Sequence, residues 1–303
     1  MAKIAVELEQ ALKQRTVNGE PGQIAERVLA EGESWNVADV VCTSGPQDRS
    51  YEEKHSQTTI VIIAAGTFQY RASTGQPGVG RELMTPGSIL LGNPGQCFEC
   101  GHQHGAGDRC LAFRFAPDYF DRLRFEAADR GSKRDFRMLR IPPLREMSRL
   151  VVDACSGLSG IGAWEELGVK LAARTVQLAS GVQPDASDAA PSAIARVTRA
   201  VRMIDRHPET QLTLSSLAKE ARLSPYHFLR VFERLTGLTP HQYVLRARLR
   251  EAALRLTLES SNIIDIALSC GFGDVSNFNR AFRTEFGLSP RAYRQQSSSA
   301  VLK

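Results

Sequence analysis

A cluster of side chains that can bind metal or react with oxidants lies between residues 97 and 110. Three of the six cysteines and two of the six histidines fall within these fourteen residues, namely Cys97, Cys100, His102, His104 and Cys110. Thiolates and imidazoles are ligands that Zn²⁺ prefers, and accessible thiolates react with oxidants. In a reducing compartment such a density indicates a metal or thiol site before it indicates a disulfide. The cofactor stays unidentified, with zinc or another metal as one hypothesis.

Three interpretations of this cluster stay open: a metal site, a reactive-thiol sensor, or buried cysteines beside a ligand pocket. Only one C-x2-C pair is present, and Gly101 breaks the C-x-x-C-H pattern of haem attachment. Side chains alternate along a strand, so the Cys97 and Cys100 sulfurs converge only if the chain turns, which Gly95 and Gly101 permit. Alternatively, Cys97 and Cys110 face each other across a hairpin.

Other catalytic patterns are weak. His55 resembles a fragment of the cupin metal motif, but the second histidine of that motif is replaced by Gln57. This departure disfavours a cupin metalloenzyme. No Ser/His/Asp arrangement, phosphate loop or paired-carboxylate motif stands out in the sequence. We therefore predict that the protein is not an enzyme.

The C-terminal third repeats itself. The pattern F-x4-G-L-[ST]-P-x2-Y begins at Phe232 and again at Phe282, an offset of 50 residues. Two copies are too few for a solenoid and indicate a duplicated small domain. Within the first copy, Phe228, Val231, Phe232 and Leu235 recur at helical spacing and form a buried stripe. Each copy is thus predicted to hold a short helix, a tight turn and a second, amphipathic helix.

Local signals define the second helix of each copy. Ser224 and Asp274 are suitable N-caps, and Pro225 suits the first helical position because its missing N–H would be unpaired there. Between the copies, residues 240–256 are predicted to form one helix of about 17 residues, or ~25 Å. A helix, a tight turn and a second helix with polar and basic side chains outward is the arrangement that places the second helix, the recognition helix, in the major groove of DNA. A spacer of this length would hold the two recognition helices roughly one turn of DNA apart, near the ~34 Å pitch.

Residues 212–294 resemble the double helix-turn-helix domain of the AraC/XylS regulators. The resemblance rests on the second-half signature I-x2-I-A-x3-G-F-x5-F-x3-F-x4-G-x2-P-x2-Y, which runs from Ile263 to Tyr293. It implies that the outward faces of the two recognition helices meet DNA. Arg230 and Arg280 would read a guanine or clamp a phosphate, and both alternatives stay open. The implied contact residues are Tyr226, Leu229, Arg230, Val275, Ser276, Asn279 and Arg280.

Charge supports a polyanion partner for this part of the chain only. Residues 193–296 carry 16 Lys and Arg against 9 Asp and Glu, whereas residues 1–192 carry 21 against 24. A basic domain beside a mildly acidic one is typical of nucleic-acid binding. The small, polar stretch 181–192 contains two prolines and is predicted to be a linker.

Upstream of the linker the sequence predicts strands and helices. β-branched or alternating runs punctuated by Gly and Pro occur at residues 58–63, 66–71, 88–91 and 110–115. Helical spacing extends from 144 to 180, with an interruption at 157–162. The predicted fold class is α+β. It combines a cupin-like β-barrel (about 35–118) with flanking helices (about 140–180) in residues 1–180, and an all-α domain of two helix-turn-helix units joined by a helix in residues 193–297.

The predicted function is a sequence-specific DNA-binding transcriptional regulator that responds to a small-molecule, metal or redox signal through its N-terminal domain. Its expected partners are double-stranded promoter DNA, an unidentified effector, a second copy in a homodimer and, for an activator, RNA polymerase. No apolar run is long enough to cross a membrane and no secretory signal is visible, so we expect a cytoplasmic protein. Two alternatives are a cupin-type metalloenzyme with a DNA-binding tail and a DNA-binding adaptor whose N-terminal domain makes only protein contacts.

Overall fold

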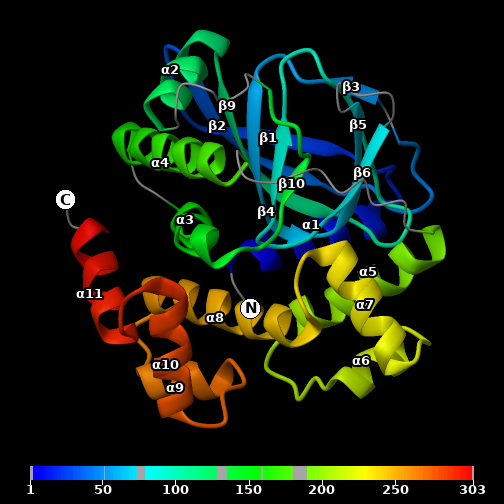
Figure 1. Ribbon diagram of the computed structural model, residues 1–303, viewed down its shortest axis with the longest axis vertical. Coiled ribbons are helices and arrows are strands. Elements are labelled where there is room, and N and C mark those ends of the chain that lie inside the picture. Colours follow the sequence, from blue (N-terminus) through cyan, green and yellow to red (C-terminus); the bar gives the residue numbers. More distant parts are fainter. Residues whose placement is uncertain are drawn as a thin grey trace.

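A computed structural model describes residues 3–50, 52–73, 79–127, 135–157, 160–179 and 190–301. Figure 1 shows a β-rich N-terminal part packed above a wholly helical C-terminal part. Most of the predicted linker, residues 181–189, lies outside the described residues. Among the described residues, no helix is long and apolar enough to cross a membrane.

The strands form two antiparallel sheets. The six-stranded sheet has the order β1-β2-β9-β4-β7-β10, and the four-stranded sheet has the order β3-β8-β5-β6. In the larger sheet the strands are β1 (Ile24–Gly32), β2 (Trp35–Cys42), β4 (Thr58–Gly66), β7 (Ile89–Gly92), β9 (Asp108–Phe115) and β10 (Arg140–Ile141). In the smaller sheet they are β3 (Glu52–Lys54), β5 (Phe68–Ser73), β6 (Val79–Met84) and β8 (Cys97–Gly101).

Strand β4 shows why the sequence carries an unbroken β-branched run here. Ile60 and Ile62 face the helices that cover the larger sheet, whereas Val61 and Ile63 face the smaller sheet. All four side chains are buried. A strand with both faces covered loses the usual alternation of apolar and polar residues, so it is apolar throughout.

Helices cover the outer face of the larger sheet (Figure 1). They are α2 (Pro117–Ala127), α3 (Arg145–Cys155) and α4 (Ile161–Ala179), of which the last two lie within the predicted helical stretch 144–180. Trp164, Leu167 and Leu171 of α4 pack in the same core as Ile60 and Ile62 of β4. A further helix, α1 (Lys3–Asn18), precedes the strands.

The prediction of a cupin-like barrel is not confirmed. The described strands make two separate hydrogen-bonded sheets that do not close into one barrel. The predicted start at about residue 35 also missed β1 and α1. Strand β1 lies at an edge of its sheet and is mostly exposed, with Ala30 as its one buried residue, so it lacks an apolar pattern that sequence analysis could detect.

The C-terminal part consists of α5 (Pro191–Arg206), α6 (Leu214–Glu220), α7 (Pro225–Thr236), α8 (Pro240–Leu258), α9 (Ile263–Ser269), α10 (Val275–Phe286) and α11 (Pro290–Val301). Its repeat appears in the packing geometry. Phe232 meets Tyr243 edge-on at a centroid distance of 5.6 Å, and Phe282 meets Tyr293 edge-on at 5.3 Å. Each unit thus builds its own core around the same pair of rings, and α8 contributes to both cores.

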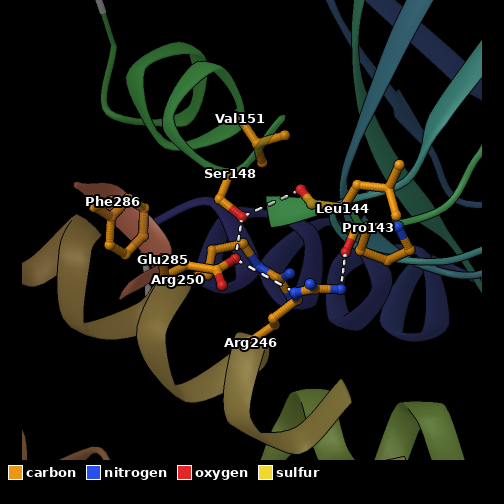
Figure 2. A pocket seen from close by; sticks show the side chains of 9 residues that line it. Pro143, Leu144, Ser148, Val151, Arg246, Arg250, Glu285 and Phe286 are labelled. Carbon is orange, nitrogen blue, oxygen red and sulfur yellow. Dashed lines mark hydrogen bonds and ion pairs between the residues drawn. The ribbon is translucent and has the colours of Figure 1, made fainter. Parts of the chain in front are cut away.

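The two parts of the chain are joined by specific polar contacts. Figure 2 shows Glu285 of α10 accepting a hydrogen bond from Ser148 of α3 and pairing with Arg246 of α8 at 3.4 Å. Arg246 also donates to the carbonyl oxygen of Pro143 at 2.8 Å. At the C-terminal end of α7, Arg140 of β10 donates to the carbonyl oxygen of Thr236 at 3.0 Å. These contacts orient both helix-turn-helix units against the N-terminal part.

Candidate nucleic-acid interface and N-terminal cavity

Capping and turn residues fix the position of α7. The Ser224 hydroxyl accepts a hydrogen bond from the backbone N–H of His227, and Pro225 occupies the first turn, as predicted. The turn before α7 contains Arg222 at φ +52°, the one non-glycine residue with a positive φ among those described. Gly237 ends the helix in the left-handed conformation at φ +76°. A short helix, a tight turn and a sharply bounded second helix follow from these residues.

Helix α10 is built in the same way 50 residues later. The Asp274 carboxylate accepts from the backbone N–H of Asn277 at 2.7 Å. Gly271, at φ +87°, takes the place that Arg222 has in the first unit, and Gly287 at φ +76° ends the helix. A side chain at Gly271 would lie 2.6 Å from the carbonyl oxygen of Glu209, so this turn requires glycine for both its φ and its space.

The outward face of α7 carries polar and aromatic side chains. Tyr226 is 70% exposed and Arg230 is exposed, whereas Leu229 is half-buried. The Arg230 guanidinium lies 6.0 Å from the centre of the Tyr226 ring. This side-by-side arrangement presents a cation and an aromatic hydroxyl to the same surface, where a nucleic-acid backbone or base edge could meet both.

The outward face of α10 is more polar. Ser276, Asn279 and Arg280 are exposed and Val275 is half-buried. Arg280 donates to the amide oxygen of Asn277 at 3.1 Å, which restricts the rotamers of the arginine before any partner binds. A shallow surface hollow is lined by Asn279 and Arg280 together with exposed residues that the resemblance did not single out. These further residues extend the face and are Arg283, Thr284 and Arg291.

Helix α8 sets the distance between the two faces. It has 19 residues, two more than predicted, and is therefore ~28 Å long. Figure 1 shows α7 and α10 near its opposite ends, with the N-terminal part on the far side of α8 from α6 and α9. Five of the seven predicted DNA-contact residues are exposed, namely Tyr226, Arg230, Ser276, Asn279 and Arg280.

A second candidate site lies inside the N-terminal part. A cavity of about 280 Å³ opens between the two sheets, with walls contributed by β2, β4, β8 and β9. Its lining includes Cys42, Cys100, His102, Asp108 and Cys110. Three of the five residues of the predicted Cys/His cluster, namely Cys100, His102 and Cys110, thus reach one cavity.

The remaining two residues of that cluster lie elsewhere. Cys97 is exposed and pairs across the sheet with Lys54, and His104 does not line the cavity. Cys97 and Cys110 do not face each other across a hairpin, because β8 and β9 belong to different sheets. Every cysteine of the chain is a free thiol in the structure.

Two cavity residues, Cys42 and Asp108, were not part of the predicted cluster. Asp108 and Cys110 lie two positions apart on β9 and therefore share a face, a signal that the sequence does contain. Cys42 is opposite Asp108 in the pairing of β2 with β9, and this register is not visible in the sequence. The cavity therefore has a donor set different from the predicted one.

Hydrogen bonds connect these donors. His102 Nε2 lies 2.6 Å from Asp108 Oδ1, and the Cys110 thiol donates to Asp108 Oδ2 at 3.0 Å. Burial is the largest single influence on His102 and lowers its pKa, but the interactions with Asp108 and Cys42 together outweigh burial and raise the pKa of His102 to about 9. Burial, with the Asp108 carboxylate as the next cause, raises the pKa of the Cys110 thiol.

His55 stands in the cavity wall in a different role. Its Nε2 lies 2.8 Å from the Tyr70 hydroxyl, and its ring stacks on Phe98 at 4.1 Å. Burial, assisted by the charge of Arg114, lowers the pKa of His55 to about 4. A neutral, stacked and hydrogen-bonded imidazole is a structural element of the wall.

Known proteins resemble this chain in its C-terminal third. Residues 217–296 match the family model of a helix-turn-helix domain. The HTH-type transcriptional regulator ArgR of Pseudomonas aeruginosa is 36% identical over 101 residues, which are 33% of this chain and 31% of that protein. The HTH-type transcriptional activator RhaS of Klebsiella pneumoniae is 36% identical over 101 residues, which are 33% of this chain and 36% of that protein.

Among solved structures, a transcriptional regulator from Chromobacterium violaceum with an AraC-type DNA-binding domain is 30% identical. The match covers 34% of this chain and 91% of that chain, with a TM-score of 0.32. The chain spans about a third of the length of the curated relatives it matches. The repeat in residues 217–296 is a helix-turn-helix domain of the AraC/XylS family, and the family prediction is confirmed.

Proposed function

We propose that the protein is a sequence-specific regulator of transcription that binds double-stranded promoter DNA through α7 and α10. The observation that carries this proposal is the duplicated construction of the two helices. Each has a capped start, a left-handed end, a buried aromatic stripe and an exposed polar face, and the ~28 Å long helix α8 lies between the two units. A rigid pair of polar helix faces at this spacing suits two successive major grooves on one side of a duplex.

Each recognition face offers one arginine for base readout. Arg230 and Arg280 are exposed and lie at equivalent positions, 50 residues apart. A guanidinium can donate two hydrogen bonds to guanine, and the contact of Arg280 with Asn277 orders it in advance. Tyr226, Leu229, Val275, Ser276 and Asn279 would then supply the neighbouring backbone and base contacts.

The N-terminal part supports a signal-receiving role. Its cavity of about 280 Å³ is large enough for a small ligand or an ion and is lined by thiol, imidazole and carboxylate groups. Polar contacts tie this part to both helix-turn-helix units, so a change in the cavity can reach the DNA-binding faces. We include in the proposal a homodimer and, for activation of transcription, contact with RNA polymerase.

The test is selection of double-stranded sequences from a random pool by the full chain, followed by affinity measurements at several salt concentrations. We expect an enriched sequence and binding that weakens steeply with salt. Arg280→Ala should lose about 1–3 kcal/mol of discrimination at one base step. Lys170→Ala removes an exposed charge from α4 and serves as the control that should leave discrimination unchanged.

Two results would contradict the proposal. One is the absence of any enriched sequence together with weak, sequence-independent binding. The other is equal weakening by Arg280→Ala on every sequence with only a flatter salt dependence, which would make Arg280 a phosphate contact and remove it from base readout.

A further inference from the structure

Three buried side chains of different donor type converge at one point of the N-terminal cavity. Cys42 comes from β2, Asp108 from the start of β9, and His102 from the segment after β8. One potential ligand atom of each lies within 4.8 Å of the other two, and all three residues are buried. The pairing of Cys42 with Asp108 in the larger sheet fixes two of the donors, and the His102–Asp108 hydrogen bond fixes the third.

We propose that Cys42, His102 and Asp108 bind a thiophilic divalent ion of the Zn²⁺ type, with the Cys110 sulfur beside them as a further donor. Thiolate, imidazole and carboxylate form a mixed set that zinc accepts, whereas Mg²⁺ and Ca²⁺ prefer oxygen alone. Three protein ligands leave one tetrahedral position, which the Cys110 sulfur or a small molecule in the cavity could take, because Cys42, His102, Asp108 and Cys110 all line that cavity.

The geometry needs only a small adjustment to admit the ion. In a tetrahedral zinc site the histidine nitrogen and the carboxylate oxygen are about 3.3 Å apart, given zinc–ligand distances of about 2.0–2.2 Å. His102 Nε2 and Asp108 Oδ1 are 2.6 Å apart and share a hydrogen bond. The ion would replace the shared proton, and the distance between the two atoms would increase by less than about 1 Å. Side-chain rotation and a shift of the intervening loop supply such a movement.

The distribution of thiols favours a metal site over a purely structural His–Asp pair. A hydrogen-bonded imidazole and carboxylate satisfy each other without sulfur. Yet three of the six cysteines, Cys42, Cys100 and Cys110, line this one cavity as free thiols. Soft sulfur donors beside an imidazole select for zinc and similar ions.

The site is mechanically connected to the helical part of the chain. His102 and Asp108 lie at the two ends of a short loop, and Arg202 of α5 donates hydrogen bonds to the backbone of that loop. Arg202 donates to the carbonyl oxygens of Ala106 at 3.0 Å and Gly107 at 3.3 Å, and its Nε donates to Thr67 Oγ1 at 2.8 Å.

Helix α5 carries this contact into the first helix-turn-helix unit. Val197 and Val201 of α5 are fully buried in the core that contains Phe228 of α7. A movement of the loop on metal binding is therefore transmitted through Arg202 to the base of a recognition helix. This second step, the coupling to DNA, rests on the proposed function, whereas the metal site does not.

The metal site is tested on the full chain, freed of metal by a chelator and then titrated with Co²⁺ and Zn²⁺. We expect one equivalent of Co²⁺ to give the intense charge-transfer absorption of a thiolate ligand, and Zn²⁺ to displace it. Cys42→Ser, His102→Gln and Asp108→Asn should each weaken binding by more than about 10-fold. Cys97→Ser and His104→Gln are the matched controls and should bind as the parent does.

Failure of the site has a clear signature. An absence of stoichiometric binding by the parent chain would overturn it. Loss of binding in Cys97→Ser with none in Cys42→Ser would also overturn it, because the ion would then be held by the Cys97–Cys100 pair. Far-UV circular dichroism of each variant separates loss of a ligand from loss of the fold.

The coupling is tested by measuring affinity for the selected DNA with and without Zn²⁺. We expect at least a fivefold change, and by linkage DNA should change the affinity for Zn²⁺ by the same factor. Arg202→Gln should retain metal binding and lose the coupling. Normal zinc binding with an unchanged DNA affinity would overturn the coupling, whereas a chain that binds zinc but no DNA would contradict the proposed function and leave the metal site standing.

Discussion

Two equivalent glycines make a matched test of how the two parts of the chain are packed together. Gly237 and Gly287 end α7 and α10 in the same left-handed conformation, both at φ +76°. A methyl group at Gly287 would meet no atom within 4 Å. At Gly237 it would lie 2.5 Å from Cγ and 2.7 Å from Cβ of Pro142, in the N-terminal part. Substitution by alanine therefore imposes the same backbone strain at both positions, and a collision at one.

The expected costs follow from this difference. Alanine in the left-handed region costs about 1–2 kcal/mol, and the reduced entropy of the unfolded chain offsets part of that equally in both variants. Overpacking adds about 1–3 kcal/mol at Gly237 alone. If the chain avoids the collision by moving α7 away, it loses the Arg140–Thr236 hydrogen bond, which contributes about 1 kcal/mol. Gly237→Ala should thus be about 1–3 kcal/mol less stable than Gly287→Ala.

Urea unfolding followed by two probes measures this difference. Both tryptophans, Trp35 and Trp164, are buried in the N-terminal part, so their fluorescence reports that part. Far-UV circular dichroism reports mainly the helices, most of which are C-terminal. We expect the two transitions to separate in Gly237→Ala, because the contact between the parts is strained, and to stay together in Gly287→Ala. Equal stability of the two variants would refute the packing of Gly237 against Pro142.

Three further substitutions probe separate features of the chain. Burial lowers the pKa of His55 to about 4, so as pH falls below 6.5 the unfolded chain takes up the proton before the folded chain does. From pH 7 to pH 5 the parent should therefore lose about 2 kcal/mol of unfolding free energy that His55→Gln keeps. Parallel pH profiles of the two proteins would disprove this. Asp274→Ala should cost about 1 kcal/mol in urea unfolding by removing the cap of α10, whereas Asn262→Ala, whose side chain makes no cap bond to α9, should be near neutral. Cys97 is the exposed thiol, so a thiol reagent should show one fast phase that Cys97→Ser abolishes; a fast phase that survives would place another thiol at the surface.

The helical third of the chain was predictable because its signals are local. The caps Ser224 and Asp274, and the helix spanning residues 240–256, depend on side chains within a few positions of the elements they define, and the structure has each of them. The conformation of the turn before α7 was harder to predict from the sequence. Arg222 adopts a positive φ there, whereas the equivalent position of the second unit is Gly271. Here the surrounding helices impose a conformation that the residue alone would not indicate.

The N-terminal part was predicted less completely because its organisation depends on long-range pairing. The strands near residues 60, 70, 90 and 112 were found, but their division into two sheets was not. That division separates Cys97 from Cys110 and instead brings Cys42, sixty-six positions before Asp108, opposite it. Composition showed that donors were abundant in residues 97–110, but only the register shows which of them meet.

The basic charge of the C-terminal third also has two roles that the sequence could not separate. Arg230 and Arg280 face outward, where a polyanion can reach them. Arg202, Arg246 and Arg250 face inward and donate to carbonyl oxygens of the N-terminal part. The excess of 16 basic over 9 acidic residues therefore overstates the charge available to DNA.

Under the proposed function, these inward arginines would keep the two parts oriented and still allow them to respond to a signal. Guanidinium groups bonded to backbone carbonyls depend on the position of the loops that carry those carbonyls, and a loop can shift without unpacking a core. Arg202 holds the loop between His102 and Asp108, and Arg250 holds Pro86, in the turn that precedes β7. In the proposed coupling, an event in the cavity that displaces the first loop by a fraction of an ångström would shift α5 while the two helix-turn-helix cores stay intact. The cavity and the recognition helices are thus connected by the cations that a count of surface charge would have assigned to DNA.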